Sequence, residues 1–340
     1  MNTPTPATRP AVDTARAVLA HLGLTPHDLL ELPSNAPTFA GAVPKLRPTL
    51  TTRTLSTYNT HLRNLETLWA DRPLDEPTTA ELTQLAQHAQ THRRTQRGTR
   101  NGASAREHFV SAVRCLYRYA EHNKWIHPHN NPARALTIPA RTPSHRHAIP
   151  PEYLQQICDT AATTGNDPAL DSLLLRLHTE TACRRQGALR LRPDDLDPQH
   201  CLVRLCEKGD HRWQPVSPTL MNYLIRHGTR RGSTPGTPLL RFDNKQPLTA
   251  RRYDNLWSRL AAHIPWVAAQ QVTTHWLRHT TLTWVERHYG YATARAYAGH
   301  TTHRPGTTAT YVKADIHEIA TALATLTQEA HPLALSDYSI

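Results

Sequence analysis

Residues 273–313 constrain the fold of this chain more than any other stretch. Several of their polar side chains can act at one site if a helix and the loop after it come together. His275 and Arg278 are three residues apart, so on a helix they share one face. A glycine marks a break before His300, and Tyr311 follows after a loop that contains Pro and Gly. The stretch therefore predicts a cation, two imidazoles and a phenol in one neighbourhood.

This combination of side chains suits chemistry on a phosphodiester. The guanidinium of arginine is planar and always charged, and it matches phosphate oxygens with two hydrogen bonds. Imidazoles donate to phosphate oxygens or move protons near neutral pH. A tyrosine hydroxyl attacks phosphorus when its site stabilises the oxyanion. The stretch therefore indicates a phosphate site with a covalent nucleophile.

The overall charge indicates a polyanionic partner. The formal net charge is +12 and the isoelectric point is about 9.8, values typical of proteins that bind nucleic acid. Two groups of arginines are candidates for contact with double-stranded DNA, although a solvated charged loop or helix face explains each of them too. The candidates are Arg93, Arg94, Arg97, Arg100 and Arg106 in a run without interleaved acids, and Arg251 and Arg252 on a predicted helix over 249–262.

Composition argues against several other classes of protein. The five cysteines are irregularly spaced, which favours a reducing cytosol over a disulfide framework. The 23 histidines are scattered without ligand spacing, so we expect no metal and no cofactor. No apolar run is long enough to span a membrane, and no signal-peptide pattern opens the sequence, so we expect a cytoplasmic protein without a membrane partner.

Helical periodicity and breaker residues divide the chain into domains. We expect an N-terminal extension over 1–38, a small helical domain over 39–135 and a Pro-rich basic linker over 136–150. A second domain over 151–330 precedes a short tail over 331–340.

Motif order supplies the more specific signal. The segments HWLRHT, YAGH and TTATYVK resemble the HxLRH, LGH and nucleophilic-tyrosine motifs of the tyrosine recombinases, the phage-integrase family. The resemblance implies a mainly α-helical fold with a small β-hairpin or sheet. It also implies two domains that form a C-shaped clamp on DNA, a SAM-like core-binding domain and a catalytic domain. Its C-terminal part rests on motifs, and its N-terminal part on domain order alone.

Two further boxes extend the resemblance. The segment TACR is similar to the family's TGLRxxE box, which gives Arg184 the position of the first catalytic arginine and leaves Arg185 on another helix face. Extended runs on either side of Lys208 predict a β-hairpin that resembles the family's GKGxKxR hairpin, in which the lysine reaches the cleaved phosphate. Gly187 departs from the family pattern, because a Glu that supports the local structure is usual there.

A second departure concerns the nucleophile. His300 and Tyr311 are eleven residues apart, a wider spacing than the family's usual one, and the loop between them can absorb the difference. Tyr297 competes weakly for the nucleophile's role because it precedes His300. His303 is a lesser candidate for the site, and His279 is expected to support packing.

The resemblance implies a role for each candidate. Tyr311 would attack a backbone phosphate to form a 3′-phosphotyrosyl bond without a metal, while Arg184 and Arg278 bind the non-bridging oxygens. Lys208 would protonate the leaving 5′-oxygen and His275 would take or share the tyrosine proton. His300 would hydrogen-bond a phosphate oxygen.

These features favour a site-specific recombinase that integrates or excises a mobile element. A catalytically silent DNA-binding relative, a dimer-resolving recombinase of chromosomes or plasmids, and a relaxing topoisomerase remain as alternatives. We expect a homo-oligomer, a tetramer on two DNA sites, with a possible accessory DNA-bending or directionality factor. An amphipathic helix from Ile316 to Leu326 packs either on its own domain or on a neighbouring subunit.

Overall fold

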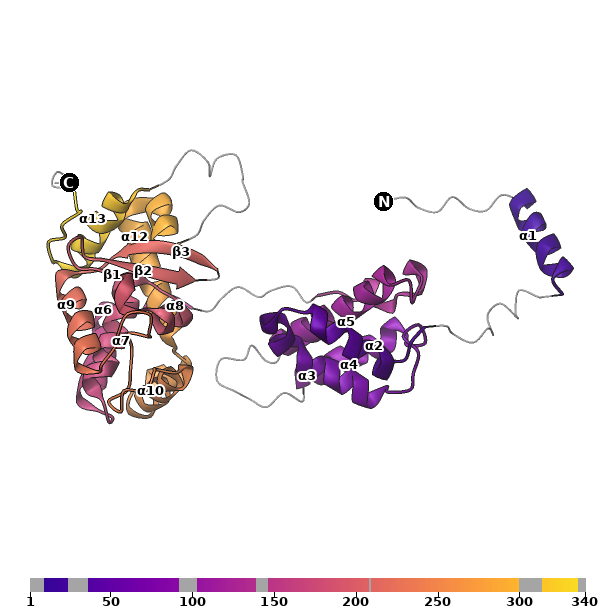
Figure 1. Ribbon diagram of the computed structural model, residues 1–340, viewed down its shortest axis with the longest axis horizontal. Helices are drawn as coiled ribbons and strands as arrows, with labels where there is room; N and C mark the ends of the chain where they lie inside the picture. Colours follow the sequence, from indigo (N-terminus) through magenta and orange to yellow (C-terminus); the bar gives the residue numbers. More distant parts are fainter. Residues whose placement is uncertain are drawn as a thin grey trace. The chain divides into compact units, whose positions relative to one another are not determined.

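The computed structural model divides into two compact units, residues 1–142 and 143–340, and the division falls within the expected linker. Figure 1 shows that helices dominate both units and that the second unit alone carries a sheet among the described residues. A mainly helical fold with a small antiparallel sheet is thus confirmed. The structure describes residues 9–23, 36–91, 103–138, 146–207, 209–299 and 314–335.

The first unit is a helical domain with its own core. The ring of Phe39 and the side chains of Leu62, Leu82 and Leu116 are fully buried in it. A capping box of Thr78 and Glu81 begins its fourth helix, where Glu81 accepts a hydrogen bond from the Thr78 backbone N–H at 2.8 Å. The helices are α1 (Arg9–His21), which buries no residue, α2 (Phe39–Leu46), α3 (Thr52–Leu68), α4 (Thr79–Thr91) and α5 (Ala103–His122).

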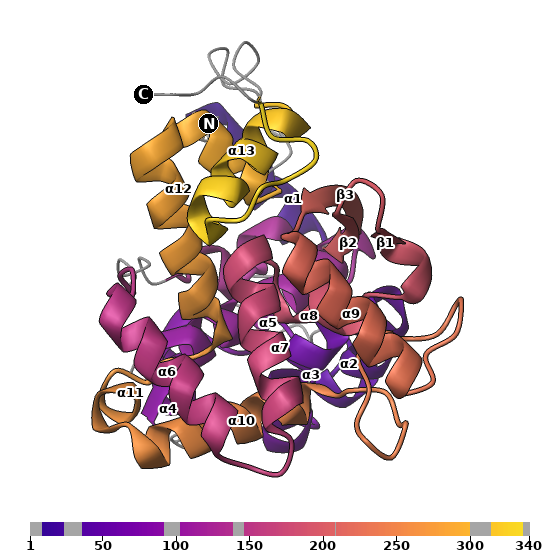
Figure 2. The same ribbon diagram turned by 90° about the vertical axis from the view of Figure 1, so that its left-hand side faces the viewer.

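The second unit surrounds a central helix, α7 (Pro168–Thr181), which packs on α6, α9 and α12 (Figure 2). Its leucines are buried because a helix enclosed on most sides must be apolar nearly all round. The other helices are α6 (Pro151–Thr163), α8 (Arg185–Arg190), α9 (Pro218–Arg230), α10 (Ala250–His263), α11 (Pro265–Ala269), α12 (Thr274–Tyr297) and α13 (Ile316–Thr327). Short 3₁₀ turns cover Arg47–Thr49, Pro128–Asn130, Pro132–Arg134 and Pro193–Asp195.

The sheet has three antiparallel strands in the order β1 (Leu196–Asp197), β2 (Leu202–Glu207) and β3 (Asp210–Pro215). The β2–β3 hairpin is the one predicted around Lys208, and Glu207 pairs with Asp210 across its turn. Gly209 has a φ of 89°, a left-handed conformation that glycine adopts without strain. The two-residue strand β1 was not anticipated.

The C-terminal elements close over the sheet. Helix α12 is kinked at Gly290, where φ is 79°, and α13 packs against α12 and β3 of the same chain (Figure 1). Asp315 starts α13 with a capping box that includes Glu318. Leu323 is fully buried in the resulting small core. The packing of this helix on its own domain is one of the two arrangements expected from the sequence.

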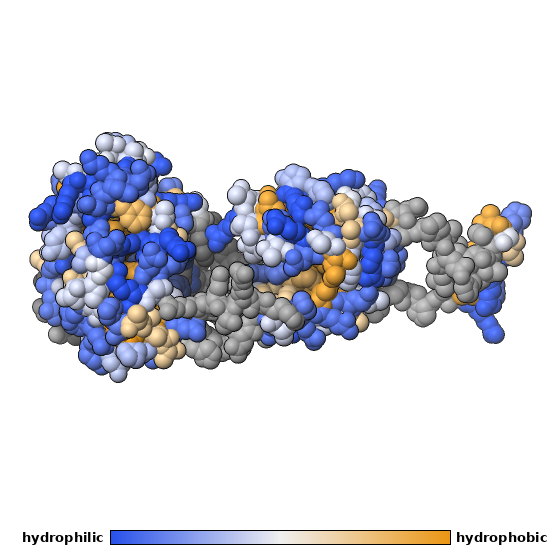
Figure 3. Space-filling model, turned by 90° about the horizontal axis from the view of Figure 1, so that it is seen from below, coloured by the Kyte–Doolittle hydropathy of each residue, from blue (hydrophilic) through white to orange (hydrophobic). Residues whose placement is uncertain are grey.

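The visible surface of both units is largely hydrophilic, with scattered apolar residues (Figure 3). Among the described residues, no helix combines the length and the apolar character that crossing a membrane requires.

Candidate active site

The TACR box lies at a sharp turn between α7 and α8. Ala182 ends α7 in a left-handed conformation, with a φ of 49°, and its N–H donates to the His178 carbonyl at 3.0 Å. Arg184 then has extended backbone angles and directly precedes α8. The side chain of Arg184 reaches the hairpin, because its Nη1 donates to Glu207 at the end of β2. Arg185 forms an exposed ion pair with Asp254 at 3.2 Å, so the two neighbouring arginines have different partners.

Arg278 is buried in the first turns of α12 and is 4% exposed. Its guanidinium donates to the carbonyl of Ala182, and also to the carbonyl of Ala298 at 2.7 Å. It therefore ties the turn after α7 to the end of α12. Burial, and after it the positive charge of Arg184, lowers the pKa of Arg278 to about 10. Because Arg184 affects this pKa, the two guanidinium groups expected to bind a phosphate lie in one electrostatic neighbourhood.

Glu207, at the end of β2, joins the arginines and was not anticipated as a site residue. It is 6% exposed, and it accepts a hydrogen bond from Arg184 Nη1 at 2.7 Å and another from the Arg184 backbone N–H. Its carboxylate also lies 4.0 Å from Arg212 Nη2 on β3. These contacts tie the Glu207 carboxylate to two arginines of the cluster and hold the cluster in place.

Arg212 is a third arginine of this cluster. Burial lowers its pKa, whereas the neighbouring Glu207 carboxylate raises it. Its side chain packs against Gly299, so closely that a Cβ at residue 299 would overlap the Arg212 side chain. Gly299 has a φ of 63° and immediately precedes His300, so the structure brings the chain that leads into this candidate next to the arginines.

His275 lies on α12 one turn from Arg278, as the spacing predicted. His275 is an exposed residue, and the burial of part of its side chain lowers its pKa to about 4. The positive charges of Arg146, Arg278 and Arg184 lower the pKa in the same direction. His275 is therefore neutral at pH 7, the state in which an imidazole accepts a proton.

Several expected site residues fall outside the described part of the chain. They are Lys208, His300, Tyr311, Arg93, Arg94, Arg97 and Arg100. His303, the lesser candidate, also lies outside it.

The remaining DNA-contact candidates differ in exposure. Arg106 is half-buried on α5, and Arg251 is exposed on α10. Arg252 is 5% exposed and forms an ion pair with Asp171 at 2.6 Å. The expectation that Arg252 faces a DNA groove needs correction, because the buried ion pair already engages its guanidinium.

The competing tyrosine and histidine have structural partners. Tyr297 is fully buried and its hydroxyl donates to the carbonyl of Glu180, which leaves it no path to an external phosphate. Burial raises the pKa of the Tyr297 hydroxyl well above its ordinary value. His279 lies 3.2 Å from the Thr283 hydroxyl on the same helix, in keeping with the expected packing role.

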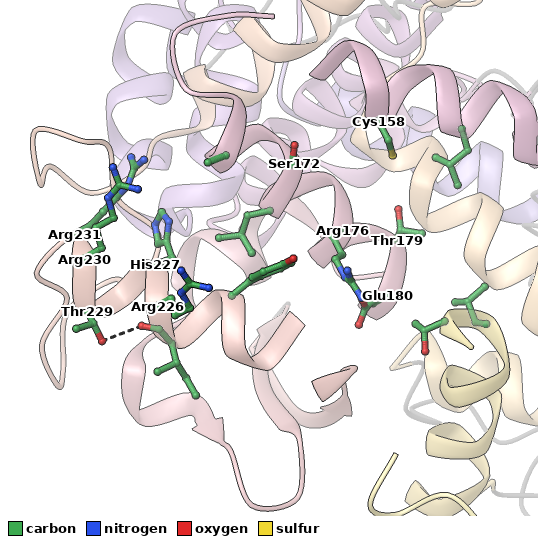
Figure 4. A pocket seen from close by; sticks show the side chains of 17 residues that line it. Cys158, Ser172, Arg176, Thr179, Glu180, Arg226, His227, Thr229, Arg230 and Arg231 are labelled. Carbon is green, nitrogen blue, oxygen red and sulfur yellow. Dashed lines mark hydrogen bonds and ion pairs between the residues drawn. The ribbon is translucent and has the colours of Figure 1, made fainter. Parts of the chain in front are cut away.

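A separate cavity of about 1020 Å³ lies among α6, α7, α9 and the end of α13 (Figure 4). Its lining is mainly apolar, with Arg176 bridging Glu180 at 2.7 Å and Glu329 at 2.5 Å. None of the described site residues lines this cavity. Within the described ranges, no group of three or more His, Cys, Asp or Glu side chains could hold a metal ion.

Comparison with known proteins connects this site to a family. The profile of the phage integrase family matches residues 148–318, which include Arg184, Glu207, His275 and Arg278. Because the match spans half of the chain, this protein belongs to the phage integrase family. It is an enzyme, a tyrosine site-specific recombinase that acts in DNA recombination.

Solved structures share the fold at low sequence identity. A lambda integrase tetramer bound to a Holliday junction aligns with a TM-score of 0.62 and 16% identity, over 88% of this chain and 90% of that chain. A Tn1549 transposon integrase in complex with a circular intermediate DNA gives 0.60 and 15%, over 82% and 95%. XerH recombinase bound to a palindromic difH substrate gives 0.58 and 14%, over 80% and 76%. A search of curated proteins gave no match.

Proposed function

We propose that this recombinase cuts and rejoins double-stranded DNA through a 3′-phosphotyrosyl intermediate and thereby integrates or excises a mobile element. Tyr311 attacks the scissile phosphorus, so a bond forms between its oxygen and phosphorus while the bond to the 5′-oxygen breaks. His275 takes the phenol proton and Lys208 gives a proton to the leaving oxygen. His300 hydrogen-bonds a phosphate oxygen. A 5′-hydroxyl from a partner strand reverses the step, so rejoining needs no external energy source and no metal.

One observation carries the proposal: Arg184, in the turn before α8, and Arg278, on α12, converge in the family-matched segment, where Arg278 donates to the carbonyl of Ala182. Two guanidinium groups held by buried partners are preorganised for the negative charge that develops on a pentavalent phosphorus. The neutral state of His275 suits it to accept the phenol proton.

We also propose the assembly in which the reaction occurs. Lambda integrase binds a Holliday junction as a tetramer, and the similar fold supports a tetramer of this chain on two DNA sites. Arg93, Arg94, Arg97, Arg100 and Arg106 of the first unit and Arg251 of the second would contact DNA phosphates. An accessory DNA-bending or directionality factor remains a prediction from the sequence.

A second candidate function is the resolution of chromosome or plasmid dimers. The fold shared with XerH, a site-specific recombinase bound to a difH substrate, is compatible with a recombination role other than integration. Both functions use the same chemistry, and the DNA that flanks the gene distinguishes them, because an adjacent attachment repeat would indicate integration.

A nicked suicide substrate tests the shared chemistry. The probe is a duplex selected from a random-sequence pool by its affinity for the Tyr311→Phe protein, with a nick introduced beside each candidate phosphate. We expect the wild-type protein to form a covalent adduct on it, also in EDTA, and Arg278→Ala to bind the duplex but lose at least about 10²-fold in adduct formation. A strict requirement for magnesium, or an equal loss of binding and cleavage in Arg278→Ala, would contradict the proposal.

A further inference from the structure

The chain departs from two family motifs at positions that touch in the structure. Gly187 stands where the TGLRxxE box has its acid, and Glu207 stands where the GKGxKxR hairpin has the glycine before its lysine. A Cβ added at residue 187 would lie 2.8 Å from Oε1 and 2.9 Å from Cγ of Glu207. The glycine therefore leaves the space that the glutamate side chain fills.

The backbone does not itself require glycine at residue 187. Gly187 lies in α8, and it is not among the described residues with a positive φ. Close approach of another side chain is the remaining physical reason for glycine at a buried helical position. That side chain is Glu207, so the two departures explain each other.

The contacts of Glu207 show how its carboxylate acts on Arg184. Its two carboxylate oxygens fix Arg184 at two points, the backbone N–H and the Nη1 atom. The backbone contact sets where α8 begins, and the side-chain contact sets the direction of the guanidinium. Only one guanidinium nitrogen is used in this ion pair and the Arg184 side chain is 24% exposed, so the rest of the group can face a phosphate.

The carboxylate of Glu207 also offsets repulsion among the positive charges of the cluster. The three arginines repel one another, since Arg184 lowers the pKa of both Arg212 and Arg278, and Arg212 also lowers the pKa of Arg278. Glu207 acts on Arg212 and Arg278 in the opposite direction and offsets this repulsion. An arginine cluster that is held together before DNA arrives needs less rearrangement when the phosphate binds.

We propose that Glu207 is the positioning residue of the active site and holds Arg184 in its phosphate-binding geometry. Compared with the two motifs, the acid stands on β2 and not on α8, and the glycine stands on α8 and not on β2. This inference rests on the proposed phosphotyrosyl chemistry. It identifies Gly187 and Glu207 as a coupled pair whose side chains can be swapped only together.

A double-substitution cycle tests the coupling. The four proteins are wild type, Gly187→Glu, Glu207→Gly and the doubly substituted chain, each assayed for adduct formation on the selected nicked duplex and for binding to the intact duplex. We expect each single substitution to slow adduct formation by about 10- to 100-fold, because a catalytic group misplaced by about 1 Å can lose that much. The double substitution should recover most of the rate, which is a strongly non-additive result. Binding should change far less than the rate.

A conservative variant and a matched control complete the design. Glu207→Gln keeps the side chain's size but removes its charge. We expect it to slow adduct formation, while a thermal unfolding experiment shows that the variant is still folded. Asp254→Asn removes the carboxylate of the neighbouring exposed Arg185 ion pair and should leave the rate unchanged. A double variant no faster than Glu207→Gly would overturn the positioning role alone, whereas a wild-type protein without any adduct would overturn the proposed chemistry and this inference with it.

Discussion

Arg278 shows how a single side chain builds the site at the scale of one residue. It donates to carbonyls of Ala182 and Ala298, at the ends of two different helices. These contacts satisfy donors on a nearly buried guanidinium, which would otherwise carry a large desolvation penalty. Arg278 therefore both stabilises the fold and positions a positive charge, so its substitution should affect both stability and the rate of adduct formation.

His178 gives a prediction for stability against pH. It is 1% exposed, with Nδ1 lying 3.0 Å from the Cys183 carbonyl and Nε2 lying 3.0 Å from the Tyr253 hydroxyl. Burial lowers its pKa from 6.5 to about 4. The neutral form is favoured in the folded state, so this stabilisation is fully present above pH 6.5 and is lost as pH falls toward 4. The shift corresponds to about 3 kcal/mol of unfolding free energy.

Denaturant unfolding at pH 7, 5 and 4 measures this effect. Burial also lowers the pKa values of His227 and His331, so the wild-type protein should lose more stability in acid than His178 alone explains. His178→Gln should be less stable at pH 7 and should lose less on acidification. An identical pH dependence in the two proteins would show that His178 does not titrate in this way.

Motif spacing predicted the chain positions of the arginines but not the side chain that holds them. Arg184, His275 and Arg278 stand out in sequence because each belongs to a short recognisable box. Glu207 and Arg212 do not, because strand residues reach the site only through the register of the hairpin and the packing of α8 on it. Contacts between distant segments are tertiary information that local patterns do not contain.

At the scale of an element, α10 separates two neighbouring arginines. Successive residues on a helix point about 100° apart, so Arg251 is exposed while Arg252 is directed into the domain. There Arg252 and Arg259 share the fully buried carboxylate of Asp171, at 2.6 and 2.5 Å. Both arginines of α10 have the same expected role when only the sequence is considered, and burial distinguishes them.

This difference yields a pair of predicted substitutions. Arg252→Ala should destabilise the protein by about 3 kcal/mol, because it breaks a buried ion pair and leaves the carboxylate with one partner. Arg251→Ala should change stability by no more than about 0.5 kcal/mol but weaken DNA binding at low salt. Chemical denaturation and a DNA-binding titration check both. Equal stability of the two variants would contradict the assigned roles.

Elements were predicted from the sequence with uneven success, for physical reasons. The helices predicted over 249–262 and from Ile316 to Leu326 lie close to α10 and α13 as observed, because each buries an apolar stripe. Strand β1 has only two residues, too few for an alternating pattern. The kink of α12 at Gly290 depends on a single left-handed residue, and a glycine alone does not show which conformation it adopts.

At the scale of the whole molecule, the chain has two units with separate cores, and the proposed DNA contacts and the proposed chemistry fall mostly in different units. The described residues of the active-site cluster all lie in the second unit, whereas most of the proposed DNA-contacting arginines belong to the first. The reaction chemistry should therefore survive in a fragment that lacks the first unit, at lower DNA affinity.

Residues 143–340 alone provide the corresponding prediction. This fragment should unfold cooperatively on heating, because it keeps its own core. It should bind DNA more weakly and with a shallower dependence on salt, because fewer phosphates are neutralised. Calorimetry and binding titrations at several salt concentrations measure both. A salt dependence as steep as that of the full chain would contradict a DNA-contact role for the first unit.

Identification of the residue that becomes attached to DNA tests the central claim most directly. The covalent adduct on the nicked duplex is digested with nuclease and protease, and the nucleotide-bearing peptide is sequenced by mass spectrometry. We predict a nucleotide linked through its 3′-phosphate to Tyr311, and no such peptide from Tyr311→Phe. Attachment at any other residue, or an undiminished adduct in Tyr311→Phe, would contradict the proposed site.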